Sequence, residues 1–91
     1  MAEQPDHTIK AARHVADELD RQGHAHHASA FRDALTRTHP FSVLLAALRE
    51  TCQVALTAIE AIDPVSATLI EELRLEVDKR LSEEHTRKAG A

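Results

Sequence analysis

Three histidines in the stretch GHAHHASAF, residues 23–31, are the residues whose types and spacing most suggest chemistry. His24 and His27 are three residues apart, so they share a face if the segment is helical, whereas His26 points away from them. Two imidazoles on one face bind zinc or nickel weakly, but a catalytic zinc site needs three protein ligands and a structural site needs four. Asp20, one helical turn earlier, is the only further candidate ligand in this segment. We therefore expect a solvent-exposed helix start with no bound metal and no cofactor.

A metal- or pH-responsive module that uses His24, His26 and His27 remains an alternative, because the imidazole is the side chain that titrates near neutral pH.

Other nucleophilic or phosphate-binding patterns are missing from the sequence. Cys52 is expected on the buried side of a helix, where a free thiol behaves as a small hydrophobic group. Ser42 and Ser66 stand where helices begin, so capping explains them better than nucleophilic chemistry. There is no glycine-rich phosphate loop, and no Ser, Cys or Lys stands in a motif with a base and an orienting acid. We therefore predict that the protein is not an enzyme.

Acidic side chains are the second feature with functional meaning. The net charge is −4 with neutral histidines. An acidic chain lacks the basic face that collects nucleic-acid phosphates, so no direct nucleic-acid contact is expected. Complementary charge instead favours a protein partner with a basic surface, and a complex that binds nucleic acid is one such partner. The predicted contact face is on the last helix and consists of Glu71, Glu72, Glu76, Glu83 and Glu84.

Length and composition indicate one small helical domain. Ninety-one residues leave no room for a second domain, and Ala, Leu, Glu and Arg dominate. A single cysteine excludes an internal disulfide. No uninterrupted apolar run approaches the roughly 20 residues that cross a bilayer, and no basic segment followed by a hydrophobic one opens the chain. We expect a cytoplasmic protein without membrane contact.

Apolar residues recur at three- and four-residue steps in four segments, which predicts helices near residues 6–22, 24–37, 41–62 and 64–87 and a frayed tail over 88–91. Asp6 and Asp63 are expected to cap the first and last helices, and Pro64 suits a first helical position. Gly23 is expected to end the first helix, and Pro40 sets a boundary at His39. The short connections predict an all-α bundle of two antiparallel hairpins around helix 41–62.

Helix 41–62 is apolar over most of its circumference, so it is expected either at the centre of the bundle or at a subunit interface. In the last helix Val65 and Leu69 are expected to line the packed face with the core residues. The predicted core is Ile9, Leu19, Phe31, Leu35, Phe41, Leu45, Leu48, Cys52, Ile59, Ile62, Ile70, Leu73, Val77 and Leu81.

Two stretches, VADELDRQGHAHHASAFRDAL (residues 15–35) and LLAALRETCQVALTAIEAIDPVSATLIEELRLEVDKRL (residues 44–81), resemble small helical accessory proteins of phages and mobile elements. This class includes anti-CRISPR proteins. The resemblance implies a short acidic inhibitor that occludes a basic surface on a target such as a CRISPR effector complex. It carries over no functional residue.

The sequence thus favours a non-enzymatic protein-binding module. The alternative is a homo-oligomeric structural or assembly protein, with a homodimer formed through helix 41–62.

Overall fold

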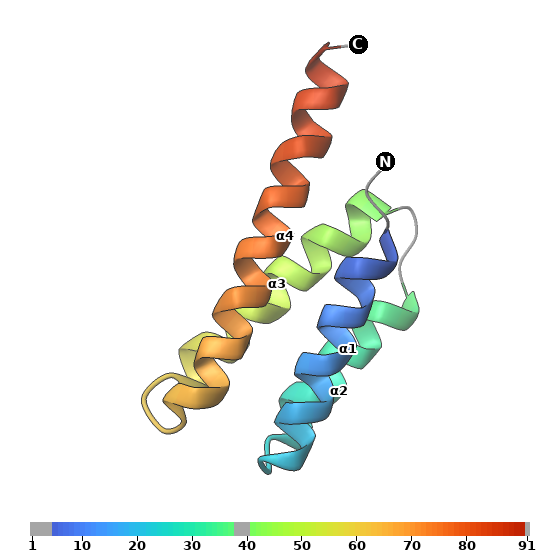
Figure 1. The fold of residues 1–91 in the computed structure, drawn as a ribbon. Helices are drawn as coiled ribbons and strands as arrows, with labels where there is room; N and C mark the ends of the chain where they lie inside the picture. Colours follow the sequence, from blue (N-terminus) through green and yellow to red (C-terminus); the bar gives the residue numbers. More distant parts are fainter. Residues whose placement is uncertain (1–4, 38–40, 91) are drawn as a thin grey trace.

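The computed structural model is an all-α bundle of four helices, as predicted: α1 (Pro5–Arg21), α2 (Ala25–Arg37), α3 (Phe41–Ile59) and α4 (Pro64–Gly90) (Figure 1). The structure describes the backbone of residues 5–37 and 41–90 and the side chains of residues 7–36 and 41–83. Of the predicted helix ends, those at residues 62 and 87 are wrong by three residues each. The boundary predicted at His39 and Pro40 lies outside the described residues.

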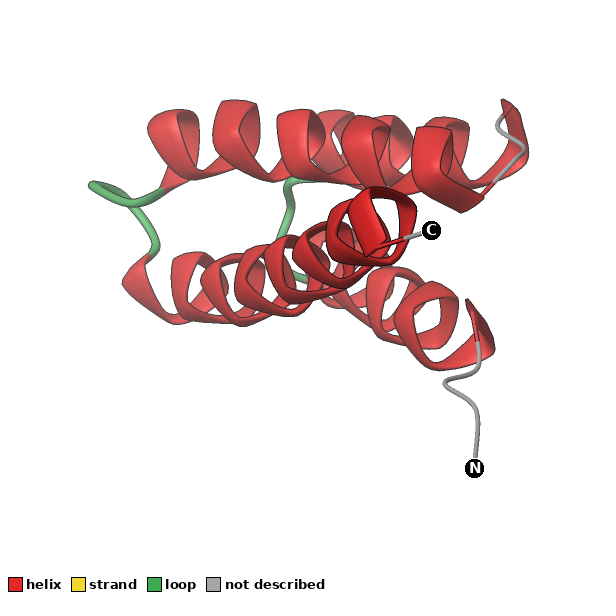
Figure 2. Ribbon diagram, turned by 90° about the horizontal axis from the view of Figure 1, so that it is seen from above, coloured by secondary structure: helices red, strands yellow, loops and turns green. Residues whose placement is uncertain are grey.

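The helices form two antiparallel hairpins, α1 with α2 and α3 with α4 (Figure 1). Helix α1 also packs on α4, and α2 packs on α3, so each helix has two main neighbours. Both hairpin turns lie at the same end of the molecule, and the C-terminal part of α4 extends beyond the other helices (Figures 1 and 2). The hairpins therefore pack side by side and do not surround α3.

Gly23 ends α1 as predicted. Its φ is +87°, a left-handed conformation that glycine adopts without steric cost. The amide of His24 donates to the carbonyl of Leu19 at 2.7 Å, and the amide of Gly23 donates to that of Asp20 at 3.2 Å. These two bonds form a Schellman motif, which satisfies carbonyl groups at the helix end.

Helix α1 begins at Pro5. The prediction that Asp6 precedes the helix as its cap is therefore wrong, because Asp6 is already in the first turn. Proline suits the first turn, because its missing N–H would have no partner there. At the other terminus, α4 continues to Gly90, so its backbone is helical where a frayed tail was predicted for residues 88–90. Strong helix formers occupy this last stretch, and no residue breaks the helix before Gly90.

The turn between α3 and α4 corrects two core predictions. The amides of Ile62 and Asp63 both donate to the carbonyl of Ile59, at 2.9 and 2.8 Å, which closes α3 at that residue. Ile62 therefore lies in the turn and is 73% exposed instead of buried. Val65 is 74% exposed because the first turn of α4 directs Ser66 and Ala67 inward.

The remaining predicted core residues lie in or against the core. Nine are buried and four are partly buried around them (Leu19, Phe31, Leu45, Leu48, Cys52, Ile59, Ile70, Leu73 and Val77; Ile9, Leu35, Phe41 and Leu81). Small residues on the same apolar stripes as the predicted core also face the interior: Ala12, Ala16, Ala28 and Ala55. Their short side chains allow the helix axes to approach closely.

Helix α3 is not central, which removes one of the two positions expected for it. Only six of its 19 residues are buried. Its outer face is exposed and carries Val43, Ala46, Glu50, Gln53, Val54, Thr57 and Ala58, and Arg49 is exposed beside it, toward α4. By length and mean hydropathy alone, Phe41–Ile59 could also cross a membrane. This differs from the expectation based on uninterrupted apolar runs. Core helices of soluble proteins pass the same test.

Replacing Leu48 with Asp should unfold the protein. Leu48 is fully buried, and a carboxylate there would have no compensating partner. We expect a loss of more than about 4 kcal/mol of folding free energy, which exceeds what a small domain can spare. Circular dichroism of Leu48→Asp should show no cooperative melt. Val43→Asp, on the exposed side of the same helix, should stay within about 0.5 kcal/mol of the wild type. A folded Leu48→Asp protein would contradict the assignment of this face to the core.

Candidate functional site

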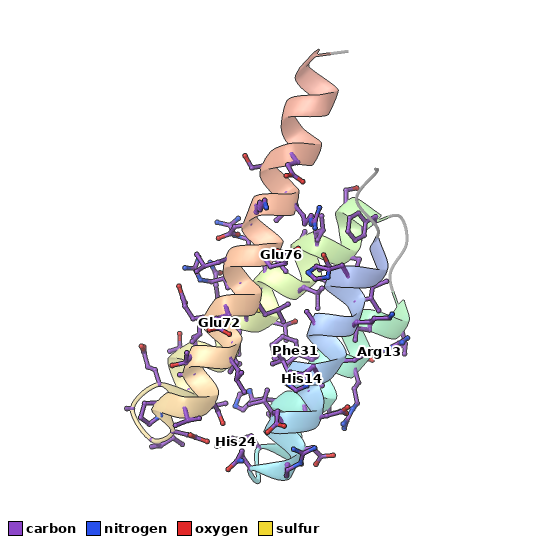
Figure 3. All side chains as sticks on the ribbon, in the orientation of Figure 1. Arg13, His14, His24, Phe31, Glu72 and Glu76 are labelled. Atoms are coloured by element: carbon purple, nitrogen blue, oxygen red, sulfur yellow. The ribbon has the colours of Figure 1, made fainter. Side chains whose placement is uncertain are left out.

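The fold separates the three neighbouring histidines. His24 turns toward the α3–α4 connection, where its Nε2 lies 2.8 Å from Oδ2 of Asp63 (Figure 3). The rings of His26 and His27 contact each other edge to face, with centroids 5.5 Å apart. Burial, followed by the two neighbouring imidazoles, lowers the pKa of His27. Within the described residues no three His, Cys, Asp or Glu side chains are grouped to hold a metal ion.

Asp63 connects the two hairpins. One oxygen of its carboxylate, Oδ1, accepts the backbone N–H of Ser66 at 3.2 Å. The other, Oδ2, accepts the hydroxyl of Ser66 at 2.7 Å and lies 2.8 Å from Nε2 of His24. An ionised carboxylate only accepts hydrogen bonds, so His24 donates from Nε2. The side-chain bond from Ser66, then that from His24, lowers the pKa of Asp63 to about 2. We refer to His24, Asp63 and Ser66 as the turn clasp.

The turn clasp contains the residue types of a hydrolytic triad in an order that does not activate a nucleophile. The hydroxyl of Ser66 donates to Asp63 and not to an imidazole, so no base is placed to take its proton. Ser66 is also 1% exposed, which keeps it away from substrates. Asp63 caps α4 by accepting the Ser66 amide, as predicted, and its bond to His24 holds the two turns together, while the Ser66 hydroxyl is a further donor to the same carboxylate.

Of the five glutamates predicted as one contact face, the four whose side chains the structure describes serve different surfaces. Glu71 pairs with Arg74 on the side of α4 that faces α3, and this hydrogen bond lowers its pKa. Arg74 also binds Asp78 at 2.8 Å, and Asp78 reaches Arg49 of α3 at 3.1 Å. Glu72 lies outward and forms no ion pair with the described residues.

Glu76 faces α1 instead of solvent. Its Oε2 accepts from Nε of Arg80 at 2.9 Å and lies 3.5 Å from the buried hydroxyl of Thr8. The Arg80 side chain is only 8% exposed, and Glu83 lies 3.5 Å from its Nη1. Glu76 and Glu83 thus neutralise a cation at the α1–α4 contact. The side chain of Glu84 lies outside the described residues.

A hollow of about 350 Å³ between α3 and α4 brings Glu71 and Glu72 together with Glu60. Glu60 was not predicted as a contact residue, because only the turn between the helices places it beside the other two. The remaining lining is Leu56, Ala67 and Thr68.

A larger groove of about 500 Å³ lies between α2 and α3, and we call it the α2–α3 groove. Its acidic side chains are Asp33 and Glu50, and none of the described lining residues is Lys or Arg. The rest of the lining is His27, Ala30, Ala34, Ala47, Thr51 and Val54. Val54 also borders a shallower, apolar hollow with Gln53, Thr57 and Ala58, which extends the surface along α3. This groove was not predicted from the sequence, although the 4-3-4 spacing of residues 47, 51, 54 and 58 was a visible signal.

Cys52 is fully buried, and burial raises its pKa to about 12. The thiol is therefore protonated and inert at neutral pH. Its position agrees with the predicted role as a small core residue.

The chain matches no protein-family model, no curated protein and no solved structure. The likeness to phage accessory proteins therefore remains a prediction from the sequence pattern alone.

Asp63→Asn should lower the thermal midpoint, because the amide is a weaker acceptor for Ser66 and His24. The folded pKa of about 2 lies below the unfolded value of 3.8. The contribution of Asp63 ionisation is therefore present above about pH 4 and is lost as the pH falls toward 2. The thermal midpoints of wild type and Asp63→Asn should therefore converge as the pH falls from about 4 to 2. Asp20→Asn is the matched control, because the side chain of Asp20 is exposed. It should leave the thermal midpoint nearly unchanged at both pH 2 and pH 4. A constant gap between the two curves down to pH 2 would contradict the role of the charge.

Glu76→Gln should cost about 1–3 kcal/mol in the free energy of unfolding, because it leaves the buried Arg80 guanidinium short of a charge partner. Glu72 lies one helical turn before Glu76, in a solvated position. Glu72→Gln removes the same charge and should change the free energy of unfolding by less than about 0.5 kcal/mol. Urea titration at neutral pH measures both. Equal effects of the two substitutions would show that Glu76 has no structural role.

Proposed function

We propose that the protein is a non-enzymatic protein-binding module whose contact surface is the outer face of α3 with the two acidic hollows beside it. The observation that carries this proposal is the position of α3. It is the most apolar helix of the chain, yet only six of its 19 residues are buried. Besides its core residues, α3 exposes Val43 and Val54 on its outer face, and these exposed apolar side chains support a contact with another protein.

The surface has the composition of a protein interface. Val54 is 59% exposed in the middle of the outer face, and Val43 is exposed near its start. Removing such side chains from water contributes roughly 25 cal/mol per Å² of apolar area. Glu50 and Asp33 lie on one side of this strip, and Glu60, Glu71 and Glu72 lie on the other. An apolar centre with a charged rim is the usual arrangement at a protein–protein contact.

The acidic rim, together with the net charge of −4, favours a partner with a basic surface. Glu71 and Glu72 keep the contact role predicted from the sequence, whereas Glu76 and Glu83 are assigned to the packing of α4. An inhibitor that covers a basic surface of a target complex, as the sequence resemblance implies, is one form of this proposal. Self-association through α3 is the competing use of the same face.

Affinity capture with matched variants tests the proposal. The tagged chain is passed through lysate of the organism that encodes it, as wild type, as Val54→Arg and as Val65→Arg. Both substitutions place an arginine at an exposed valine, but only Val54 lies on the outer face of α3. We expect a partner that wild type and Val65→Arg retain and that Val54→Arg loses by at least about tenfold, as truncation of a central contact does.

Protection of Cys52 from a thiol reagent confirms that each variant is folded. Equal retention by all three proteins would overturn the proposed surface. Recovery of untagged copies alone, confirmed as dimers by light scattering, would replace it with self-association.

A further inference from the structure

We propose that the occupant of the α2–α3 groove is a basic amphipathic helix of the partner protein, with a Lys or Arg side chain paired to Glu50. This inference rests on the function proposed above and names the chemistry of the partner.

The groove has the shape that a third helix needs. On α3, Ala47, Thr51, Val54 and Ala58 follow one another at steps of four, three and four residues. On α2, His27, Ala30 and Ala34 follow at steps of three and four. Rows with this spacing form the ridges and holes into which the side chains of another helix insert. Because most of these side chains are small, the axis of the incoming helix can approach both α2 and α3 closely.

The charge of the groove selects the partner. Glu50 is exposed and forms no ion pair with the described residues, and Asp33 lies on the opposite side of the groove. His27 adds no positive charge at neutral pH, because burial lowers its pKa. A purely apolar helix seated here would remove the Glu50 carboxylate from water without a partner, which is costly. A cation on the helix offsets that cost and gives the contact its direction.

The same charges oppose a second copy of this chain. A dimer that joins two α2–α3 grooves would bring together the Glu50 side chains of both copies. Each copy also carries a net charge of −4. Like charges at one interface disfavour association, whereas a basic helix meets complementary charge.

Three synthetic peptides test this inference directly. Each is a helix of about 20 residues, which spans about 30 Å. All carry alanine at 3-4 spacing along one face and differ only at the central position beside that face, which is Lys, Gln or Glu. Fluorescence anisotropy measures their binding to wild type, to Glu50→Lys and to Glu72→Lys, the last being a matched charge reversal outside the groove. Protection of Cys52 confirms the fold of each variant.

We expect the wild type to bind the Lys peptide at least about tenfold more tightly than the Glu peptide. Glu50→Lys should reverse this preference, and Glu72→Lys should retain it. Equal affinity for the three peptides, a preference that Glu50→Lys does not change, or no binding to the wild type would each overturn the inference. Two other results would also overturn the inference. One is a wild-type dimer that Val54→Arg abolishes, and the other is wild-type binding to lipid vesicles that Val54→Arg abolishes.

The two proposals fail in different ways. If Val54→Arg loses the captured partner but the peptides do not discriminate by charge, the α3 surface stands and the basic-helix occupant is wrong. If Val54→Arg retains the captured partner, the proposed function itself is wrong.

Discussion

The carboxylate of Asp63 holds together parts of the molecule that are far apart in the sequence. It satisfies the first turn of α4 through the amide and hydroxyl of Ser66 and also binds His24, 39 residues earlier. The cap fixes the rotation of α4 about its axis, and this rotation directs Ser66 inward and Val65 outward. The bond to His24 sets one hairpin turn against the other. One partly buried, ionised side chain therefore contacts both hairpin turns.

Most of the charge on α4 is used within the fold. Arg74 lies on the side toward α3 and Arg80 on the side toward α1, and each is matched by carboxylates one turn away on α4 itself. Ion pairs at such positions stabilise the helix and its packing, and they leave little net charge for a partner. The carboxylates that stay open to solvent and border apolar surface flank α3: Glu50 lies in α3, Glu60 in the turn that follows it, and Glu72 in α4 across the α3–α4 hollow. This distribution moves the expected contact surface from α4 to α3.

The apolar character of α3 exceeds what the core requires. The core is completed by residues from all four helices, such as Leu19, Phe31, Leu48 and Ile70. Further valines and alanines of α3, such as Val43, Ala46, Val54 and Ala58, remain exposed on its outer face. In the proposed function these residues form the contact surface, and the carboxylate of Glu50 within that surface favours an occupant with a positive charge.

The sequence by itself determined the four helices, most of their ends, and most of the core. These features depend on neighbours within a few residues: Gly23 in its left-handed turn, Asp63 before Pro64, and apolar side chains repeated every three or four positions. Only the tertiary structure decided that His24 pairs with Asp63, that Ile62 and Val65 are exposed, that the glutamates of α4 serve different surfaces, and that α2 and α3 form an acidic groove. Each of these depends on how one helix is rotated and placed against another, and periodicity within a single helix does not contain that information.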